Sequence, residues 1–242
     1  DNDYQPGELI RFQISGKSPC GAVLDTLALS FDPNASFSKP TSIGLSQLSD
    51  AWGMAWADVD GDKDVDLFVT NYDTDEPNYL YLNDGAGNFN LHTTGSIATD
   101  NASSLAATWG DYDNDGDLDL FVANNIGYEN FLYRNDGGTN FTRILNDPIV
   151  NDKGYAHGAS WVDYDNDGYL DLFYTEYFST RFNRLFHNNG DGTFSEENAA
   201  APTLEANFSI AGIWGDYNND GLPDLFIANT EGENNSLYQN RG

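Results

Sequence analysis

Short apolar runs separated by polar turns recur along the chain, and they predict β-strands. The run Leu118–Ala123 (LDLFVA) is almost continuously apolar, which is typical of a strand covered on both faces, whereas a half-exposed strand alternates. Further strands are predicted at Ala106–Trp109, Phe131–Arg134 and Phe141–Leu145, with turn residues between them. No stretch has a long helical periodicity. The pattern therefore predicts an all-β protein.

Three sequence landmarks recur four times with a spacing of 52 or 53 residues. The first is a tryptophan two residues before an acidic loop, at Trp56, Trp109, Trp161 and Trp214. The second is an asparagine that begins an Asn-x-Leu-aromatic segment, at Asn78, Asn130, Asn183 and Asn235. The third is a phenylalanine after a turn, at Phe37, Phe89, Phe141 and Phe194. Four strands per unit at this period predict the four-stranded blades of a β-propeller.

The two ends of the repeat array do not match a whole number of units. The chain stops after the third predicted strand of unit four, whereas Phe37 lies in a fourth strand that has no unit of its own. One interpretation is ring closure, in which the segment around Phe37 completes the blade that begins near Trp214. The repeats then span residues 37–242 with four clear units. Residues 1–36 are extra strands that form a degenerate fifth blade, a cap or a strand donated to another molecule, and the number of blades stays open.

Four acidic loops carry the strongest chemical signal, at residues 58–66, 111–119, 163–171 and 216–224. In a tightly curled loop alternate positions point inward, so the side-chain oxygens of positions 1, 3 and 5 converge and position 9 closes the cage. Glycine at position 6 permits the turn that lets position 7 offer its backbone carbonyl. The predicted metal ligands at positions 1, 3, 5, 7 and 9 are Asp58, Asp60, Asp62, Asp64 and Asp66; Asp111, Asp113, Asp115, Asp117 and Asp119; Asp163, Asp165, Asp167, Tyr169 and Asp171; and Asp216, Asn218, Asp220, Leu222 and Asp224.

These oxygen ligands favour Ca²⁺, with one ion expected in each loop. A helix-loop-helix calcium site is excluded because position 12 carries no glutamate but Val69, Val122, Tyr174 and Ile227. Zinc or iron would need His or Cys, and neither lies in any of the loops. The first loop has Lys63 at position 6 and Gly61 at position 4, and the fourth has Asn218 at position 3. We expect these two loops to bind differently or more weakly.

The chain has 242 residues and a formal net charge of −29, from 39 acidic and 10 basic residues. Such a charge repels nucleic-acid phosphates and anionic membrane surfaces, so we expect neither as a partner. The single cysteine, Cys20, excludes an intramolecular disulfide; we expect a small buried side chain there, with an intermolecular disulfide as the alternative. No apolar run is long enough for a membrane helix. Sequons in predicted loops permit glycosylation, at Asn34, Asn101, Asn140, Asn207 and Asn234.

The loop pattern D-x-D-x-D-G-x-x-D-L-F, with the preceding Trp and the following N-x-L-[YF]-x-N-x-G segments, resembles FG-GAP/VCBS repeats. Such repeats build the propeller headpiece of integrin α chains and occur in many secreted bacterial proteins. The resemblance covers residues 37–242 and implies one calcium ion per blade, held between its first two strands. It also implies positions 1, 3, 5 and 9 as the metal ligands. Family propellers usually have seven blades, whereas this chain supplies four clear units.

Three functions fit these features, and the first is a secreted or cell-surface, non-catalytic calcium-binding adhesion module with a protein or glycan ligand. The second is a glycan-binding lectin, for which the best surface aromatic candidates depart from the repeat: Trp52, Tyr174, Tyr177 and Phe178. The third is a self-assembling homo-oligomer or filament that exchanges its unpaired terminal strands. We do not expect an enzyme, because the three histidines occupy non-equivalent positions and share no spacing with a nucleophile, at His92, His157 and His187.

Overall fold

Four antiparallel sheets make up the part of the chain that the computed structural model describes, residues 44–45, 50–178 and 180–242. Sheet 1 contains β1 (Ala51–Ala57), β2 (Asp66–Asn71), β3 (Tyr79–Asn83) and β4 (Phe89–Leu91). Sheet 2 contains β5 (Ser104–Gly110), β6 (Asp119–Asn124), β7 (Phe131–Asn135) and β8 (Phe141–Ile144). Sheet 3 contains β9 (Ala156–Val162), β10 (Asp171–Glu176), β11 (Arg184–Asn188) and β12 (Phe194–Glu196). Sheet 4 contains β13 (Ser209–Gly215), β14 (Asp224–Asn229) and β15 (Ser236–Tyr238).

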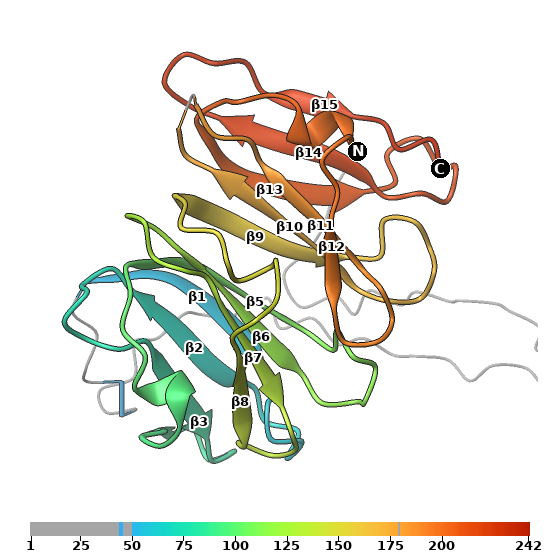
Figure 1. The fold of residues 1–242 in the computed structure, drawn as a ribbon. Coiled ribbons are helices and arrows are strands. Elements are labelled where there is room, and N and C mark those ends of the chain that lie inside the picture. Colours follow the sequence, from blue (N-terminus) through green and yellow to red (C-terminus); the bar gives the residue numbers. More distant parts are fainter. Residues whose placement is uncertain (1–43, 46–49, 179) are drawn as a thin grey trace, which may run out of the picture. The chain divides into compact units, whose positions relative to one another are not determined.

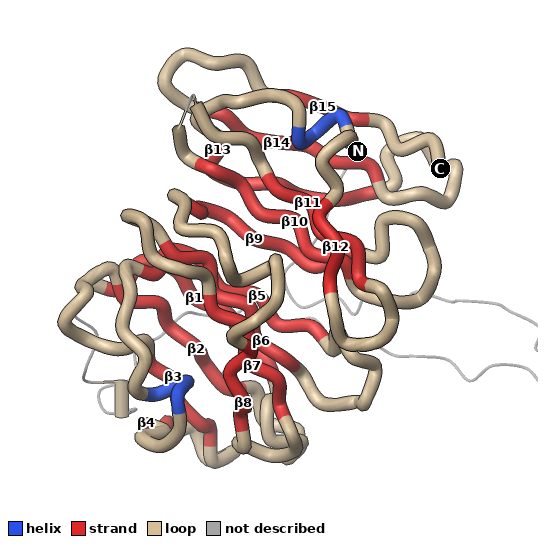
Figure 2. Tube along the Cα trace, viewed as in Figure 1, coloured by secondary structure: helices blue, strands red, loops and turns tan. Residues whose placement is uncertain are grey.

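Each sheet corresponds to one sequence repeat, so the predicted all-β class and the division into four units are confirmed. Strands follow one another in chain order within every sheet, and two short 3-10 helices, Ser96–Ala98 and Ala201–Thr203, lie in the connections (Figure 2). The second strands β2, β6 and β10 are buried at every residue. This burial explains why their sequences are continuously apolar. No helix of the described residues is long and apolar enough to span a membrane.

The first strands of successive sheets lie next to one another, in the order β1, β5, β9 and β13 (Figure 1). The repeating tryptophan joins each sheet to the one before it through an edge-to-face ring contact. The ring centroids are 6.1 Å apart for Phe68 and Trp109, and 5.8 Å apart for Phe173 and Trp214. Phe121 and Trp161 make the same contact at 6.4 Å. The repeating Trp and the Phe at the third position of β2, β6 and β10 are therefore two halves of one interface that occurs three times.

In the two outermost sheets, sheet 1 and sheet 4, one ring of the Trp–Phe interface lacks its partner and lies exposed. Phe226 of β14 is 40% exposed, whereas its equivalents Phe68, Phe121 and Phe173 have no exposed surface. On sheet 1, Trp56 is 52% exposed and contacts only Phe89 of its own sheet among the aromatic rings described. Other residues of sheet 1 are already covered, since Leu45 packs against the cluster that includes Leu67.

Two expectations about the chain ends lie outside the described residues. The strand around Phe37 and the assignment of residues 1–36, including Cys20, fall in residues 1–43, which the structure does not describe. Within residues 50–178 and 180–242, sheet 4 has three strands and β15 has no further strand beside it. Ring closure through the segment around Phe37 therefore stays a prediction.

The difference between the inner and outer sheets can be measured by removing the same side chain in two of them. Phe121→Ala should lower the free energy of unfolding by about 3–5 kcal/mol, because it opens a cavity between two sheets. Phe226→Ala should cost about 1 kcal/mol, because the ring is partly exposed. Urea denaturation of both variants measures the difference. Equal losses would mean that another part of the molecule covers Phe226 in solution.

Candidate metal site

The four acidic loops connect the first and second strands of their sheets. In three of them, carboxylate oxygens of positions 1, 3 and 5 lie within 4.8 Å of one another. The three groups are Asp58, Asp60 and Asp62; Asp111, Asp113 and Asp115; and Asp163, Asp165 and Asp167. The predicted convergence of alternate positions therefore occurs in the structure. The fourth loop has Asn218 at position 3 but makes the same hydrogen bonds between its backbone and its side chains.

The position-1 aspartate organises each loop through its two oxygens. In the second loop, Oδ1 of Asp111 accepts a hydrogen bond from the Asp115 amide and Oδ2 accepts one from the Gly116 amide. The third and fourth loops repeat both bonds around Asp163 and Asp216. Each oxygen keeps a further lone pair, because a carboxylate oxygen can accept more than one bond. The loop is thus curled with its acidic side chains turned inward.

Backbone conformation explains two residue choices in the loops. Gly116, Gly168 and Gly221 at position 6 have φ between 90° and 98°, which supports the predicted role of glycine in the turn. Position 4 also has positive φ, a feature that was not predicted from the sequence. The residues there tolerate left-handed backbone, and they are Gly61, Asn114, Asn166 and Asn219.

The first loop departs from the others, as expected from its residues. Lys63 at position 6 has a φ of 80°, a conformation that costs a residue with a Cβ about 1–3 kcal/mol. Oδ1 of Asp58 accepts a hydrogen bond from the Gly61 amide, whereas the other three loops use position 5 as this donor. The first loop therefore holds its aspartates with a different set of bonds.

Side chains at position 7 point away from the acidic groups. A Cβ added at Gly85 would lie 2.3 Å from Oδ2 of Asp64, and one added at Gly190 would lie 2.9 Å from the ring of Tyr169. Asp117 and Leu222 likewise lie near the glycine that follows the third strand. This direction agrees with the prediction that position 7 supplies only its backbone carbonyl. It also explains why Tyr and Leu are accepted there.

The position-9 aspartates are buried, and each one joins its loop to the third strand of the same sheet. Asp119 Oδ2 accepts a hydrogen bond from the Tyr112 amide at 3.0 Å, and its Oδ1 accepts one from the Asn135 amide at 2.8 Å. The same pair of bonds occurs at the other three position-9 residues, Asp66, Asp171 and Asp224. Position 9 is therefore a structural clamp as well as a predicted ligand.

Asparagines at or just beyond the ends of the third strands tie the first three loops to the next sheet. The side-chain amide of Asn135 donates to the carbonyl of Val59 in the first loop at 2.9 Å. Asn188 and Asn240 make the equivalent bonds to the carbonyls of the second and third loops. In addition, Asn114 donates to the Gly168 carbonyl of the neighbouring loop at 3.1 Å. Order in one loop is thereby linked to the packing of the sheets.

Burial makes the negative charge of these loops costly. It raises the pKa of the Asp119 carboxyl to about 7 and that of Asp171 to about 6, despite the amide hydrogen bonds that oppose the change. Burial also raises the pKa of Asp66, Asp60 and Asp113, with neighbouring carboxylates adding to the effect. A positive charge beside these carboxylates would therefore favour their ionised form.

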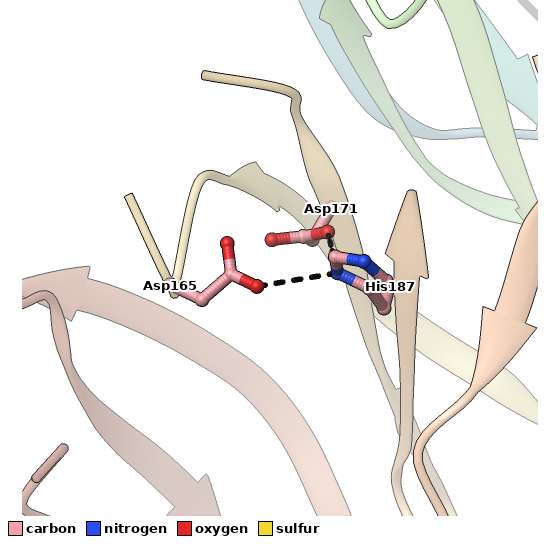
Figure 3. Close-up of side chains that lie close together, drawn as sticks. All are labelled: Asp165, Asp171 and His187. Atoms are coloured by element: carbon pink, nitrogen blue, oxygen red, sulfur yellow. Dashed lines mark ion pairs between the residues drawn. The ribbon is translucent and has the colours of Figure 1, made fainter. Parts of the chain in front are cut away.

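His187 on β11 faces the third loop and was not among the predicted site residues. Its Nδ1 lies 3.4 Å from Oδ2 of Asp165 and 3.3 Å from Oδ1 of Asp171 (Figure 3). No histidine lies within a loop along the chain, but the neighbouring strand β11 brings His187 beside the third loop. In the sequence, His187 stands immediately before Asn188, the second asparagine of the N-x-L-[YF]-x-N-x-G segment. Its side chain faces the loop in this sheet, so this position was the feature that could have indicated it.

The donor set fits a hard divalent cation. All side-chain donors inside the loops are oxygens, and Oδ1 of Asp113 is buried with no hydrogen-bond partner among the described residues. A cation of this kind would satisfy such an oxygen and offset the repulsion between the carboxylates. Asp58, Asp60 and Asp62 and their equivalents would hold it, with the clamp aspartates behind them.

Comparison with known proteins agrees with this loop geometry. The model of the FG-GAP-like repeat matches residues 58–122, 111–174 and 163–227, each match running from one acidic loop into the next. The chain belongs to the FG-GAP-like repeat family. Together the matches cover three complete repeats and all four loops, so the resemblance found in the sequence motifs is confirmed.

Among curated relatives, cartilage acidic protein 1 of Mus musculus is 25% identical over 208 residues, and that of Homo sapiens is 24% identical over 207. The matches cover 82% of this chain but only 32% and 31% of those proteins, so the FG-GAP chain spans about a third of their length.

Among solved structures, BBS1N in complex with ARL6DN overlaps with a TM-score of 0.48 at 12% identity, covering 80% of this chain and 55% of that one. The V. cholerae biofilm matrix protein Bap1 overlaps at 0.42 and 17% identity, covering 93% and 29%. Overlap at this level does not determine the fold.

The strained first loop gives a test of the loop geometry. Lys63→Gly should raise the free energy of unfolding by about 1 kcal/mol, because glycine adopts positive φ without a Cβ clash. Gly116→Lys is the matched change in the second loop. It should destabilise by a similar amount through backbone strain alone, since a Cβ there meets no atom within 4 Å. Chemical denaturation in calcium measures both, and a destabilised Lys63→Gly would contradict the account.

The buried aspartates predict how stability changes with pH when calcium is removed. The folded pKa values of Asp119 and Asp171 lie above the unfolded value of about 4, so the folded state holds more protons between about pH 4 and 7. Stability in a chelator should therefore fall as the pH rises through this window. Asp119→Asn should flatten the curve. A melting temperature that rises with pH in chelator would contradict the assignment.

Proposed function

We propose that this chain is a non-catalytic, extracellular, calcium-binding module in which the metal is structural. The observation that carries the proposal is the convergence of three carboxylates in each of three loops, with buried aspartates behind them whose pKa is raised. Calcium supplies the missing positive charge when it is bound. The residues of the chain supply the oxygens, curl the loop and connect it to the sheets.

The size of the effect supports a structural role. Sites in extracellular modules bind calcium at about 10⁻⁴–10⁻³ M, and calcium at about ten times Kd adds roughly 1.4 kcal/mol per site. Four such sites are comparable with the whole net stability of a domain, which is about 5–15 kcal/mol. Loss of the ions would therefore remove a large share of the stability.

We also propose that the sheets are blades of a β-propeller. Three features support it: the first strands lie side by side, the Trp–Phe interface repeats, and sheet 4 leaves Phe226 partly exposed. A further blade on that face would bury it, as happens to the equivalent phenylalanines. The free edge of β15 would accept a strand, so a homo-oligomer or filament formed by strand exchange is the second candidate.

The proposal that this protein is extracellular rests on its predicted calcium sites and on the names of its relatives. Calcium concentrations that fill weak sites occur outside cells. The relatives are named for cartilage, a tissue dominated by its matrix, and for acidity, which matches the net charge of −29. Adhesion to a protein or glycan is the activity that such a rigid, non-catalytic scaffold would serve.

The number of bound metal ions tests the proposal. After dialysis against calcium, elemental analysis should find one ion for each loop. The double change Asp113→Asn and Asp115→Asn should remove one ion, because it replaces two charged ligands of the second loop with neutral amides that bind calcium more weakly. Asp75→Asn, an exposed acid outside the loops, is the control and should leave the count unchanged. A chain that retains no calcium, or loses none in the double variant, would refute the proposal.

A further inference from the structure

A second site lies at the end of the strands away from the acidic loops. A pocket of about 340 Å³ is lined there by residues near the starts of β1, β5, β9 and β13 and by residues just beyond the second strands. Its lining includes Trp52, Tyr72, His157 and Tyr177, with Asn125 and Thr230 beside them. The acidic loops follow the other ends of the same first strands, so the pocket and the metal loops are separate places on the molecule.

The residues of this pocket do not follow the repeat. The equivalent residues at the starts of the first strands are Trp52, Leu105, His157 and Ile210, and those beyond the second strands are Tyr72, Asn125, Tyr177 and Thr230. Residues that build the sheets, such as the repeating Trp and Asn, are the same in every unit. The side chains of the pocket vary between units, so the repeated architecture does not dictate them.

Four aromatic rings form a row across the pocket. The ring centroid of Trp52 lies 5.3 Å from that of Tyr72 and 6.5 Å from that of His157, and His157 lies 5.1 Å from Tyr177. Trp52 is 57% exposed and Tyr72 is 38% exposed. Large aromatic side chains normally bury their faces, so this row offers ring surface to a ligand. Tyr174, one of the surface aromatics predicted from the sequence, is fully buried, so that prediction is wrong.

The polar side chains that line the pocket are neutral, and a carboxylate lies beside it at Glu231. Asn125 contributes an amide and Thr230 a hydroxyl, and the hydroxyl of Tyr177 donates to Glu231 at 3.2 Å. Burial lowers the pKa of His157 and favours its neutral ring, which donates one hydrogen bond to the backbone of Ile210 and keeps its other nitrogen as an acceptor. A ligand that fits must offer an apolar face to the rings and hydroxyl groups to the amide and the imidazole. A pyranose sugar has this combination.

We propose that the pocket formed by Trp52, Tyr72, His157 and Tyr177 binds a neutral glycan, with a sugar ring stacked on Trp52. An anionic glycan is disfavoured because the chain carries a net charge of −29. Quaternary ammonium ligands are typically held in cages of aromatic rings, whereas these rings contact one another in a row. The assignment gives the proposed adhesion module its class of ligand and rests on that proposed function.

A glycan array probed with the calcium-loaded chain tests the site, and titration calorimetry with the best neutral glycan then gives the affinity. Trp52→Ala and Tyr72→Ala should each weaken binding by about tenfold, because each removes a stacking surface. Phe182→Ala is the matched control, an exposed aromatic outside this pocket, and should bind as the original chain does. Circular dichroism checks that each variant is folded.

Binding to neutral glycans that both pocket variants weaken supports the proposal. The proposal is overturned if no glycan binds, or if only sialylated or sulfated glycans bind. It is also overturned if tetramethylammonium displaces the bound glycan, or if Trp52→Ala binds with the same affinity as the control. The metal count of the same sample separates the two proposals. A chain with filled loops and no glycan binding would lose this site and keep its structural calcium.

Discussion

Crowded carboxylates are the constraint on which the rest of this structure depends. Three of the four loops curl until three acidic side chains meet, and in all four a further aspartate is buried at the base. Burial and like charge both oppose ionisation, yet the ionised form is what the surrounding amides recognise. The buried aspartate cannot simply be replaced by an apolar residue, because it accepts one hydrogen bond from its loop and one from the third strand, as Asp119 does from Tyr112 and Asn135. A bound cation would offset this charge and favour the ionised form.

The same loops take part in the contact between sheets. Asn188 and its equivalents bond to the carbonyl of the preceding loop, while the repeating tryptophan packs on the phenylalanine of the preceding sheet. One half of the interface is thus polar and depends on the shape of the loop, and the other half is apolar. A loop that loses its cation would disturb the polar half directly. We therefore expect stability to be shared between neighbouring repeats, as in other repeat proteins.

Much of the architecture could be predicted because its causes are local or periodic. The runs around β2, β6 and β10, the position-6 glycines and the converging aspartates follow from the spacing of residue types. What could not be predicted depends on contacts across strands. His187 reaches the third loop from β11, and the clamp made by Asp119 needs an amide 16 residues away. Tyr174 looked like a surface aromatic, but it occupies a strand that is buried on both faces. The pocket around Trp52 appears only when the starts of several strands are brought together.

Thermal unfolding in calcium and in excess EGTA at neutral pH would show whether the acidic loops depend on a bound cation. If cations hold the crowded aspartates in place, removal of four ions should lower the melting temperature by about 10–20 °C, from roughly 1.4 kcal/mol per site. Calcium added back should restore it, while the Asp113→Asn and Asp115→Asn chain should recover less. An unchanged melting temperature after complete removal of the metal would show that the aspartates are stable without it and would contradict the account.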